Sequence, residues 1–233
     1  MPSPKRKRKM WGSSSSSSTK KSRRKSKSYS NVYIDEAAAE ALFAEFADED
    51  DPTVMEMDGI VKLCEQLDID PESDVRILVL LWKLGSKEKP AQITKEEFMG
   101  GCNNLEIDTI EKLKSLLPSL DTGFLDQDEF KSFYKFCFQF NRQGTHKTLD
   151  KDMVVALWNM LLKGRIPDER LDTFCTFTEI QKSYTRITLD QWTSFLDFCH
   201  ECEDLSTYDE STSAWPVLID DYVEYMEEQQ KKK

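Results

Sequence analysis

The sequence lacks long apolar runs and has few of the residues that enzymes use for chemistry. No stretch approaches the roughly 18 apolar residues of a membrane span, and no apolar segment of a secretory signal follows the basic N-terminus. The 233 residues include only two histidines, His146 and His200, and eight glycines. Nucleophilic catalysis needs a base near the nucleophile, and phosphate-binding loops need glycines. These absences favour an intracellular binding protein without a cofactor over an enzyme or a membrane protein.

The six cysteines do not suggest disulfides or a metal site. They lie mostly singly in apolar helical runs, whereas disulfide frameworks occur in the short loops of small secreted domains. The run "CHEC", from Cys199 to Cys202, has the spacing of a zinc-binding pair, but a tetrahedral site needs two further ligands and His146 is far away in sequence. We therefore expect reduced core thiols and no bound metal.

The charge of the chain is divided sharply between its two parts. The overall net charge is −11, but residues 1–34 hold 11 Lys and Arg and no acid. Residues 35–233 therefore hold 21 basic and 43 acidic residues, a net charge of −22. An acidic body disfavours phosphate contacts and favours a partner with basic side chains. We expect no specific nucleic-acid binding by the body, although a nuclear nucleic-acid adaptor acting through residues 1–33 remains an alternative.

The composition of residues 1–34 predicts a disordered basic tail, because it has too few apolar groups to offset the entropy of ordering. Two basic clusters separated by a serine-rich linker are typical of a signal read by a nuclear-import receptor. A solubilising or weakly nucleic-acid-binding arm is the alternative. We expect a nuclear protein, with the cytoplasm as a second location. The predicted import signal consists of Lys5, Arg6, Lys7, Arg8, Lys9, Lys20, Lys21, Arg23, Arg24 and Lys25.

From Asp35 onward, apolar residues recur at the three- and four-residue spacing of amphipathic helices. This pattern predicts an all-α fold with a single helical domain over residues 35–229 and a disordered lysine end at 230–233. Residues 73–84 are apolar nearly all round from Val75 to Leu84, which predicts a buried central helix. A first helix is expected from Asp35, and others at about 107–117, 126–140, 150–163, 167–180, 189–202 and 215–229.

The last predicted helix has a clear inward stripe. Its apolar residues are Trp215, Leu218, Ile219, Tyr222, Val223 and Met226. The helical period then leaves Asp220, Asp221 and Glu224 on the solvent side.

A weak repeat indicates EF-hand-like helix pairs that bind no calcium. The segments "ITKEEFMGG", "FLDQDEFKSFYKF", "TLDKDMVVALW" and "ITLDQWTSFLDF" each combine a short apolar start, a capping residue, early acids and an amphipathic helix. A calcium loop requires oxygen ligands at positions 1, 3 and 5, Gly at 6 and Glu at 12. Aligning Glu129 with position 12 puts Gly123 at 6 but Pro118 and Leu120 at ligand positions, and aligning Glu97 puts an alanine at 6. A calcium-responsive EF-hand-like adaptor remains the alternative function.

Several motifs closely resemble the defective-in-cullin-neddylation proteins. They include "DGIVKLCEQLDIDPES", "FKSFYKFCFQF", "LDKDMVVALWNMLLKGR" and above all "DLSTYDESTSAWPVLIDDYVEY". The resemblance covers about residues 48–226 and implies a monomeric, non-catalytic scaffold of EF-hand-like pairs. Such a co-ligase promotes cullin neddylation by holding a neddylation conjugating enzyme beside a cullin and its RING subunit. The basic tail resembles the short nuclear members, which have no ubiquitin-associated domain.

The resemblance also implies two binding sites. The cullin's basic winged-helix domain would meet an acidic patch made of Asp190, Ala214 and Asp220, and Asp190 also suits helix capping. The acetylated N-terminal methionine of the conjugating enzyme would enter an apolar pocket, although plain core is the alternative for each lining residue. Leu84 and Ile93 stand where relatives have phenylalanines. The implied pocket residues are Met57, Ile60, Ile77, Leu78, Leu81, Leu84, Ile93, Phe140 and Met160.

Overall fold

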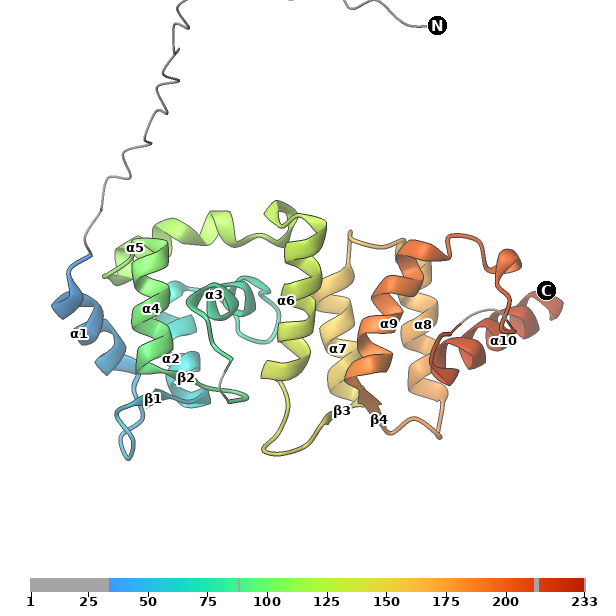
Figure 1. The fold of residues 1–233 in the computed structure, drawn as a ribbon, viewed down its shortest axis with the longest axis horizontal. Helices are drawn as coiled ribbons and strands as arrows, with labels where there is room; N and C mark the ends of the chain where they lie inside the picture. Colours follow the sequence, from blue (N-terminus) through green and yellow to red (C-terminus); the bar gives the residue numbers. More distant parts are fainter. Residues whose placement is uncertain (1–33, 88, 212–213, 233) are drawn as a thin grey trace, which may run out of the picture. The chain divides into compact units, whose positions relative to one another are not determined.

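The computed structural model describes residues 34–87, 89–211 and 214–232, and in these ranges helices dominate (Figure 1). The predicted all-α fold is confirmed. Residues 1–33, which include the whole predicted import signal, lie outside the described residues, whereas Ile34 at the end of the predicted tail is buried. The α-helices are α1 Glu36–Phe46, α2 Met57–Leu67, α3 Arg76–Leu84, α4 Lys95–Leu105, α5 Ile110–Leu116, α6 Gln127–Phe140, α7 Lys151–Leu162, α8 Asp168–Ile180, α9 Leu189–Glu201 and α10 Val217–Lys231.

Four short strands accompany the helices and form two small antiparallel sheets. Strand β1, Val54–Met55, pairs with β2, Ile93–Thr94; strand β3, Thr148–Asp150, pairs with β4, Arg186–Thr188. Each strand leads into a helix with at most one residue between them, so the chain contains the helix–strand–helix units α1-β1-α2, α3-β2-α4, α6-β3-α7 and α8-β4-α9. Two pairs of such units, each joined by its strands, are the arrangement expected of EF-hand-like pairs.

The structure differs from the predicted repeat at two segments. The segment beginning at Val54, with strand β1 and helix α2, is a full member of the repeat, and neither the segment nor α2 was predicted. The segment beginning at Phe124 has no strand; a turn of 3-10 helix, η2 Thr122–Phe124, precedes α6 there. A second, η1 Leu117–Leu120, follows α5, and a third, η3 Leu205–Thr207, follows α9.

Side-chain caps explain where the repeated helices begin. Thr94, Asp126 and Thr188 each form a capping box with the residue three positions later, which satisfies backbone N–H groups at the helix start. At the other end, α10 continues to Lys231, two residues beyond the predicted end, where Lys231 lies 3.6 Å from Glu227 one turn earlier.

The core extends through both pairs of units. The predicted central helix is confirmed as α3, whose Ile77, Leu78, Val79, Leu80, Leu81 and Leu84 are buried. Helix α3 packs against α4 and α6, and α6 also packs against α9, so α6 connects the two halves (Figure 1).

Three helices of the second half meet around one buried tyrosine. The Trp158 indole N–H donates to the Tyr134 hydroxyl (2.7 Å), which itself donates to the Trp192 carbonyl (3.1 Å). The rings of Tyr134 and Trp192 stack at a centroid distance of 4.3 Å. These contacts link α6, α7 and α9, and α8 and α10 add Phe174 and Tyr222 to the same aromatic core.

Candidate functional site

The starts of α9 and α10 carry the residues predicted to meet a cullin. Asp190 is exposed in the first turn of α9. Thr188 caps this helix together with Gln191, so Asp190 is not the cap, and the capping role suggested for it is wrong. An acid in a first turn is still favoured by the helix dipole.

Ala214 and Asp220 lie on either side of the start of α10. Ala214 is exposed, and its neighbour Trp215 packs edge-on against Phe198 of α9 at a centroid distance of 5.9 Å. Pro216 then begins the helix without a side-chain cap. Asp220 is half-buried in the first turn and accepts a hydrogen bond from the Tyr208 hydroxyl. The aromatic contact therefore holds the segment with Ala214 against α9.

A second tyrosine bond ties the two helix starts together. The Tyr184 hydroxyl donates to the Asp221 carboxylate at 2.6 Å. Tyr184 lies two residues before β4, which leads directly into α9, so this bond holds the beginnings of α9 and α10 at the same end of the domain (Figure 1).

Burial of each hydroxyl and its bond to a carboxylate raise the pKa of Tyr184 and Tyr208, which therefore stay protonated donors at neutral pH. The apolar stripe of α10 is confirmed, but Asp220 and Asp221 are not simply on the solvent side. Both are half-buried acceptors of tyrosine bonds, and Glu224 alone of the three is exposed.

The residues predicted to line the conjugating-enzyme pocket come from four helices and β2. Met57 is exposed and Met160 is half-buried, while the others are members of the core. Phe140 also borders a small pocket beside the loop before β2. The buried members are Ile60, Ile77, Leu78, Leu81, Leu84, Ile93 and Phe140.

A small pocket and an unpaired donor border this cluster. The Ala91 N–H donates to the Phe140 carbonyl at 2.8 Å, which joins the loop before β2 to the end of α6. A pocket of about 130 Å³ lies there and is lined by Phe140, Phe136 and the loop. The side-chain nitrogen of Gln92, next to Ile93, is buried and has no hydrogen-bond partner in the described structure. A buried amide N–H without a hydrogen-bond partner costs free energy, so a carbonyl oxygen that accepts from it would be bound favourably.

The loop before β2 is closed by protein groups where an EF-hand would use calcium. Glu97, at the position of a bidentate calcium ligand, accepts from the Lys87 N–H (2.8 Å) and the Thr94 N–H (3.0 Å). Ala91, at the glycine position, takes a φ of 56°. The described residues hold no group of three or more His, Cys, Asp or Glu suited to a metal ion.

The thiols are placed for packing. Burial raises the pKa of Cys64 to about 11 and that of Cys102, Cys175 and Cys199 to about 12. A thiol is a weak nucleophile unless it ionises, so these side chains are unreactive at neutral pH. None of the six cysteines forms a disulfide, and all six lie in the described ranges.

Sequence reasoning missed the partners of the predicted residues. Tyr184 and Gln92 belong to none of the motifs quoted above, and Tyr208 lies within "DLSTYDESTSAWPVLIDDYVEY" but had no role assigned to it. The tyrosine bonds join residues 37 and 12 positions apart, so no local pattern announces them. The one available signal was an aromatic residue with a hydroxyl in each polar segment before α9 and α10.

Comparison with known proteins identifies the family. Residues 112–225 match the family model described as Cullin binding. The chain is 33% identical to DCN1-like protein 3 of Homo sapiens over 197 residues, which are 83% of this chain and 63% of that protein. It is 36% identical to DCN1-like protein 4 of Homo sapiens over 189 residues (81% and 62%). The chain belongs to the DCN1-like protein family.

A DCN1-like protein is what the motifs predicted, and the family prediction is confirmed. DCN1-like protein 3 of Drosophila melanogaster is 33% identical over 185 residues, 79% of this chain and 54% of that protein. The chain thus spans 54% to 63% of the length of these DCN1-like relatives. Among the helices that the structure describes, none combines the length and apolar character needed to cross a membrane.

Proposed function

We propose that this DCN1-like protein is a non-catalytic co-ligase for cullin neddylation. It binds the winged-helix domain of a cullin that is in complex with its RING subunit. It also binds the acetylated N-terminus of a neddylation conjugating enzyme. Holding both partners turns their encounter into a nearly intramolecular step, with effective concentrations in about the millimolar range. No residue of this chain acts on the reacting bond.

The acidic surface at the starts of α9 and α10 is the observation that carries the proposal. Asp190 and Ala214 are exposed there, and two tyrosine bonds fix the carboxylates of Asp220 and Asp221. A small alanine between carboxylates permits close approach of a basic domain, while the charges steer and orient it. The match of residues 112–225 to the Cullin binding model covers all three predicted residues.

The proposed pocket for the conjugating enzyme centres on β2 and the end of α6. The buried amide N–H of Gln92 can donate to the carbonyl oxygen of an acetyl group, and the neighbouring apolar residues suit a methionine side chain. A free N-terminal ammonium group cannot accept a hydrogen bond from the Gln92 N–H, and its charge is costly to bury without a partner. Acetylation removes that charge. The core residues of the cluster must shift to admit the side chain.

Calorimetric titration of the full chain tests the cullin surface. We expect Asp190→Asn combined with Asp220→Asn to weaken binding of a cullin winged-helix domain about tenfold or more, because two charges that face the basic partner are lost. Asparagine leaves Tyr208 an acceptor, so the fold is kept. Glu111→Gln, at an exposed first-turn acid of α5, is the control. Unchanged cullin affinity in the double variant would remove the basis of the proposal.

The same titration with N-terminal peptides of the conjugating enzyme tests the pocket. We expect the acetylated peptide to bind and the free amine not to bind. Gln92→Leu keeps the size of the side chain and should weaken the acetylated peptide about tenfold, the worth of one neutral hydrogen bond. Because the wild-type donor is unpaired, this variant should not lower stability, which separates binding from folding. Equal affinity for both peptide forms contradicts the pocket.

For the tail, we propose nuclear import through its two basic clusters. Removing residues 1–33 should then change the protein's location and leave neddylation in a purified system unchanged. The calcium-adaptor alternative predicts a change in tryptophan fluorescence on adding calcium, whereas a co-ligase should show none.

A further inference from the structure

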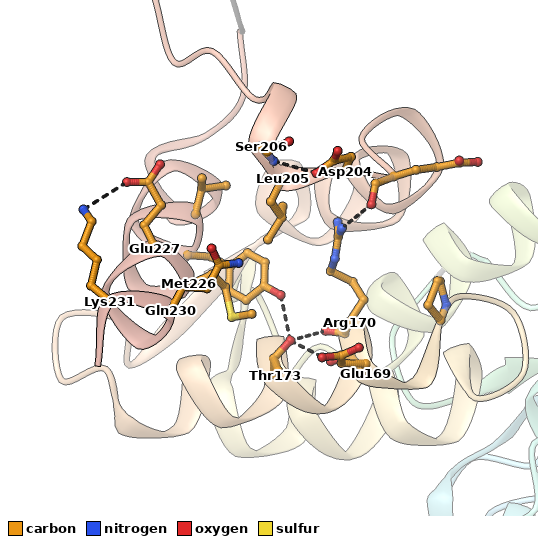
Figure 2. A pocket seen from close by; sticks show the side chains of 14 residues that line it. Glu169, Arg170, Thr173, Asp204, Leu205, Ser206, Met226, Glu227, Gln230 and Lys231 are labelled. Carbon is orange, nitrogen blue, oxygen red and sulfur yellow. Dashed lines mark hydrogen bonds and ion pairs between the residues drawn. The ribbon is translucent and has the colours of Figure 1, made fainter. Parts of the chain in front are cut away.

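A groove far from Asp190 has no role in the proposed function (Figure 2). It lies between the start of α8, the segment around η3 and the second half of α10, and its volume is about 800 Å³. Glu203, on its border, follows the end of α9, whereas Asp190 lies at the start of that helix. A helix of this length spans about 20 Å, so the groove and Asp190 lie toward opposite ends of α9.

The floor of the groove is apolar. Val223 and Tyr222 of α10 are buried, and Met226 and Leu205 are half-buried beside them. The Tyr222 hydroxyl shares a hydrogen bond of 2.8 Å with the Thr173 hydroxyl, so its polar group is satisfied within the wall. Exposed apolar atoms here favour an apolar side chain from outside.

The two cations that border the groove are already engaged. The Arg170 guanidinium donates to the carbonyls of Cys202 (3.0 Å) and Glu203 (3.1 Å). At the opposite end of the groove, the Lys231 ammonium lies 3.6 Å from the Glu227 carboxylate. Figure 2 shows Met226 between Arg170 and Lys231. The border also carries four carboxylates, so its acids outnumber these two cations.

The acids of the border are less fully neutralised. The Asp204 carboxylate accepts from the Ser206 N–H at 2.9 Å. The carboxylates of Glu169 and Glu203 are exposed and have no hydrogen-bond or salt-bridge partner within the described part of the chain. This end of the groove thus carries three carboxylates and the single guanidinium of Arg170, a net negative charge next to an apolar floor.

We propose that this groove binds a basic amphipathic helix of a partner protein. Its apolar side chains, one turn apart, pack on Leu205, Val223 and Met226, and its Lys or Arg residues face Glu169 and Glu203. Apolar anchors in a groove with complementary charges at its border are a recurring way to bind a helix. This inference does not rest on the co-ligase function.

A labelled synthetic peptide tests the groove with the full-length protein. The probe is an amphipathic helix of about four turns made of Leu and Lys, and a peptide with Glu in place of Lys is its counterpart. We expect fluorescence anisotropy to detect binding of the Lys peptide and none of the Glu peptide. Absence of binding by the Lys peptide would overturn the proposal.

Matched variants locate the binding. Glu203→Lys should weaken the Lys peptide about tenfold by placing like charges together, whereas Glu201→Lys, an equal charge change outside the groove lining, should not. Met226→Gln should also weaken it, and Met153→Gln, at an exposed methionine of α7, should not. Equal weakening by Glu203→Lys and Glu201→Lys would show general charge attraction and refute the groove. Equal weakening by Met226→Gln and Met153→Gln would likewise refute it. A comparable loss in the Asp190→Asn and Asp220→Asn variant would place the peptide at the acidic surface instead.

Discussion

At the scale of single residues, the Tyr134 hydroxyl should make a measurable contribution to stability. It bonds to Trp158 and Trp192 in a fully buried setting. Tyr134→Phe leaves the Trp158 indole N–H without its partner, so we expect a loss of about 1–3 kcal/mol in the free energy of unfolding. Urea denaturation measures this loss, and we expect the dependence of the free energy of unfolding on urea concentration to be unchanged. Tyr225→Phe, at a half-buried tyrosine of α10, is the control and should change stability little.

Single residues were predictable where a motif or a helical period determines them. The stripe of α10 and the exposure of Asp190 follow from such patterns. The tyrosine bonds and the unpaired amide of Gln92 were not predictable, because they depend on which distant segments fold together. The same limit applied to the pocket residues, because periodicity marks an apolar side chain as inward but does not distinguish core from a cavity lining.

At the scale of elements, the close packing of α3 on α4 depends on one glycine of a neighbouring pair. A Cβ on Gly101 of α4 would lie 2.4 Å from the Leu84 Cα of α3, whereas a Cβ on Gly100 would meet nothing within 4 Å. We expect Gly101→Ala to force the helices apart and lower the free energy of unfolding by about 1–3 kcal/mol. Gly100→Ala should raise it by about 0.5–1 kcal/mol, because alanine favours the helix. Similar effects of the two substitutions, measured by thermal unfolding, would contradict this packing.

Most helices were predicted from the apolar period and capping residues, whereas the strands were not. Each strand has two or three residues, too short for an alternating pattern to form. Helix α2 was missed for another reason: its Met57 and Ile60 were interpreted as part of a binding surface. The weak repeat nevertheless predicted the EF-hand-like pairing, because it records caps and apolar starts that the pairing requires.

At the scale of the whole molecule, stability should fall steeply in acid. Bonds from Lys112 and from the Asp35 N–H lower the pKa of Asp108, and a bond from Arg76 does the same for Asp74. A carboxyl with a lowered folded-state pKa stabilises the protein above its unfolded value of about 3.9 and loses this effect as pH falls through the folded value. The stabilisation from these bonds should thus persist above about pH 5 and disappear progressively below about pH 4.

The large negative charge of residues 35–233 acts in the opposite direction. Mild acidification reduces the self-repulsion of that charge, so we expect the highest stability between neutral pH and about pH 5, followed by the steep loss. Asp108→Asn removes the more buried of these two carboxylates. This variant should be less stable at pH 7 and lose less stability on acidification. Chemical denaturation across the pH range measures both curves. Parallel curves for the variant and the natural chain would mean that Asp108 does not contribute to the acid transition.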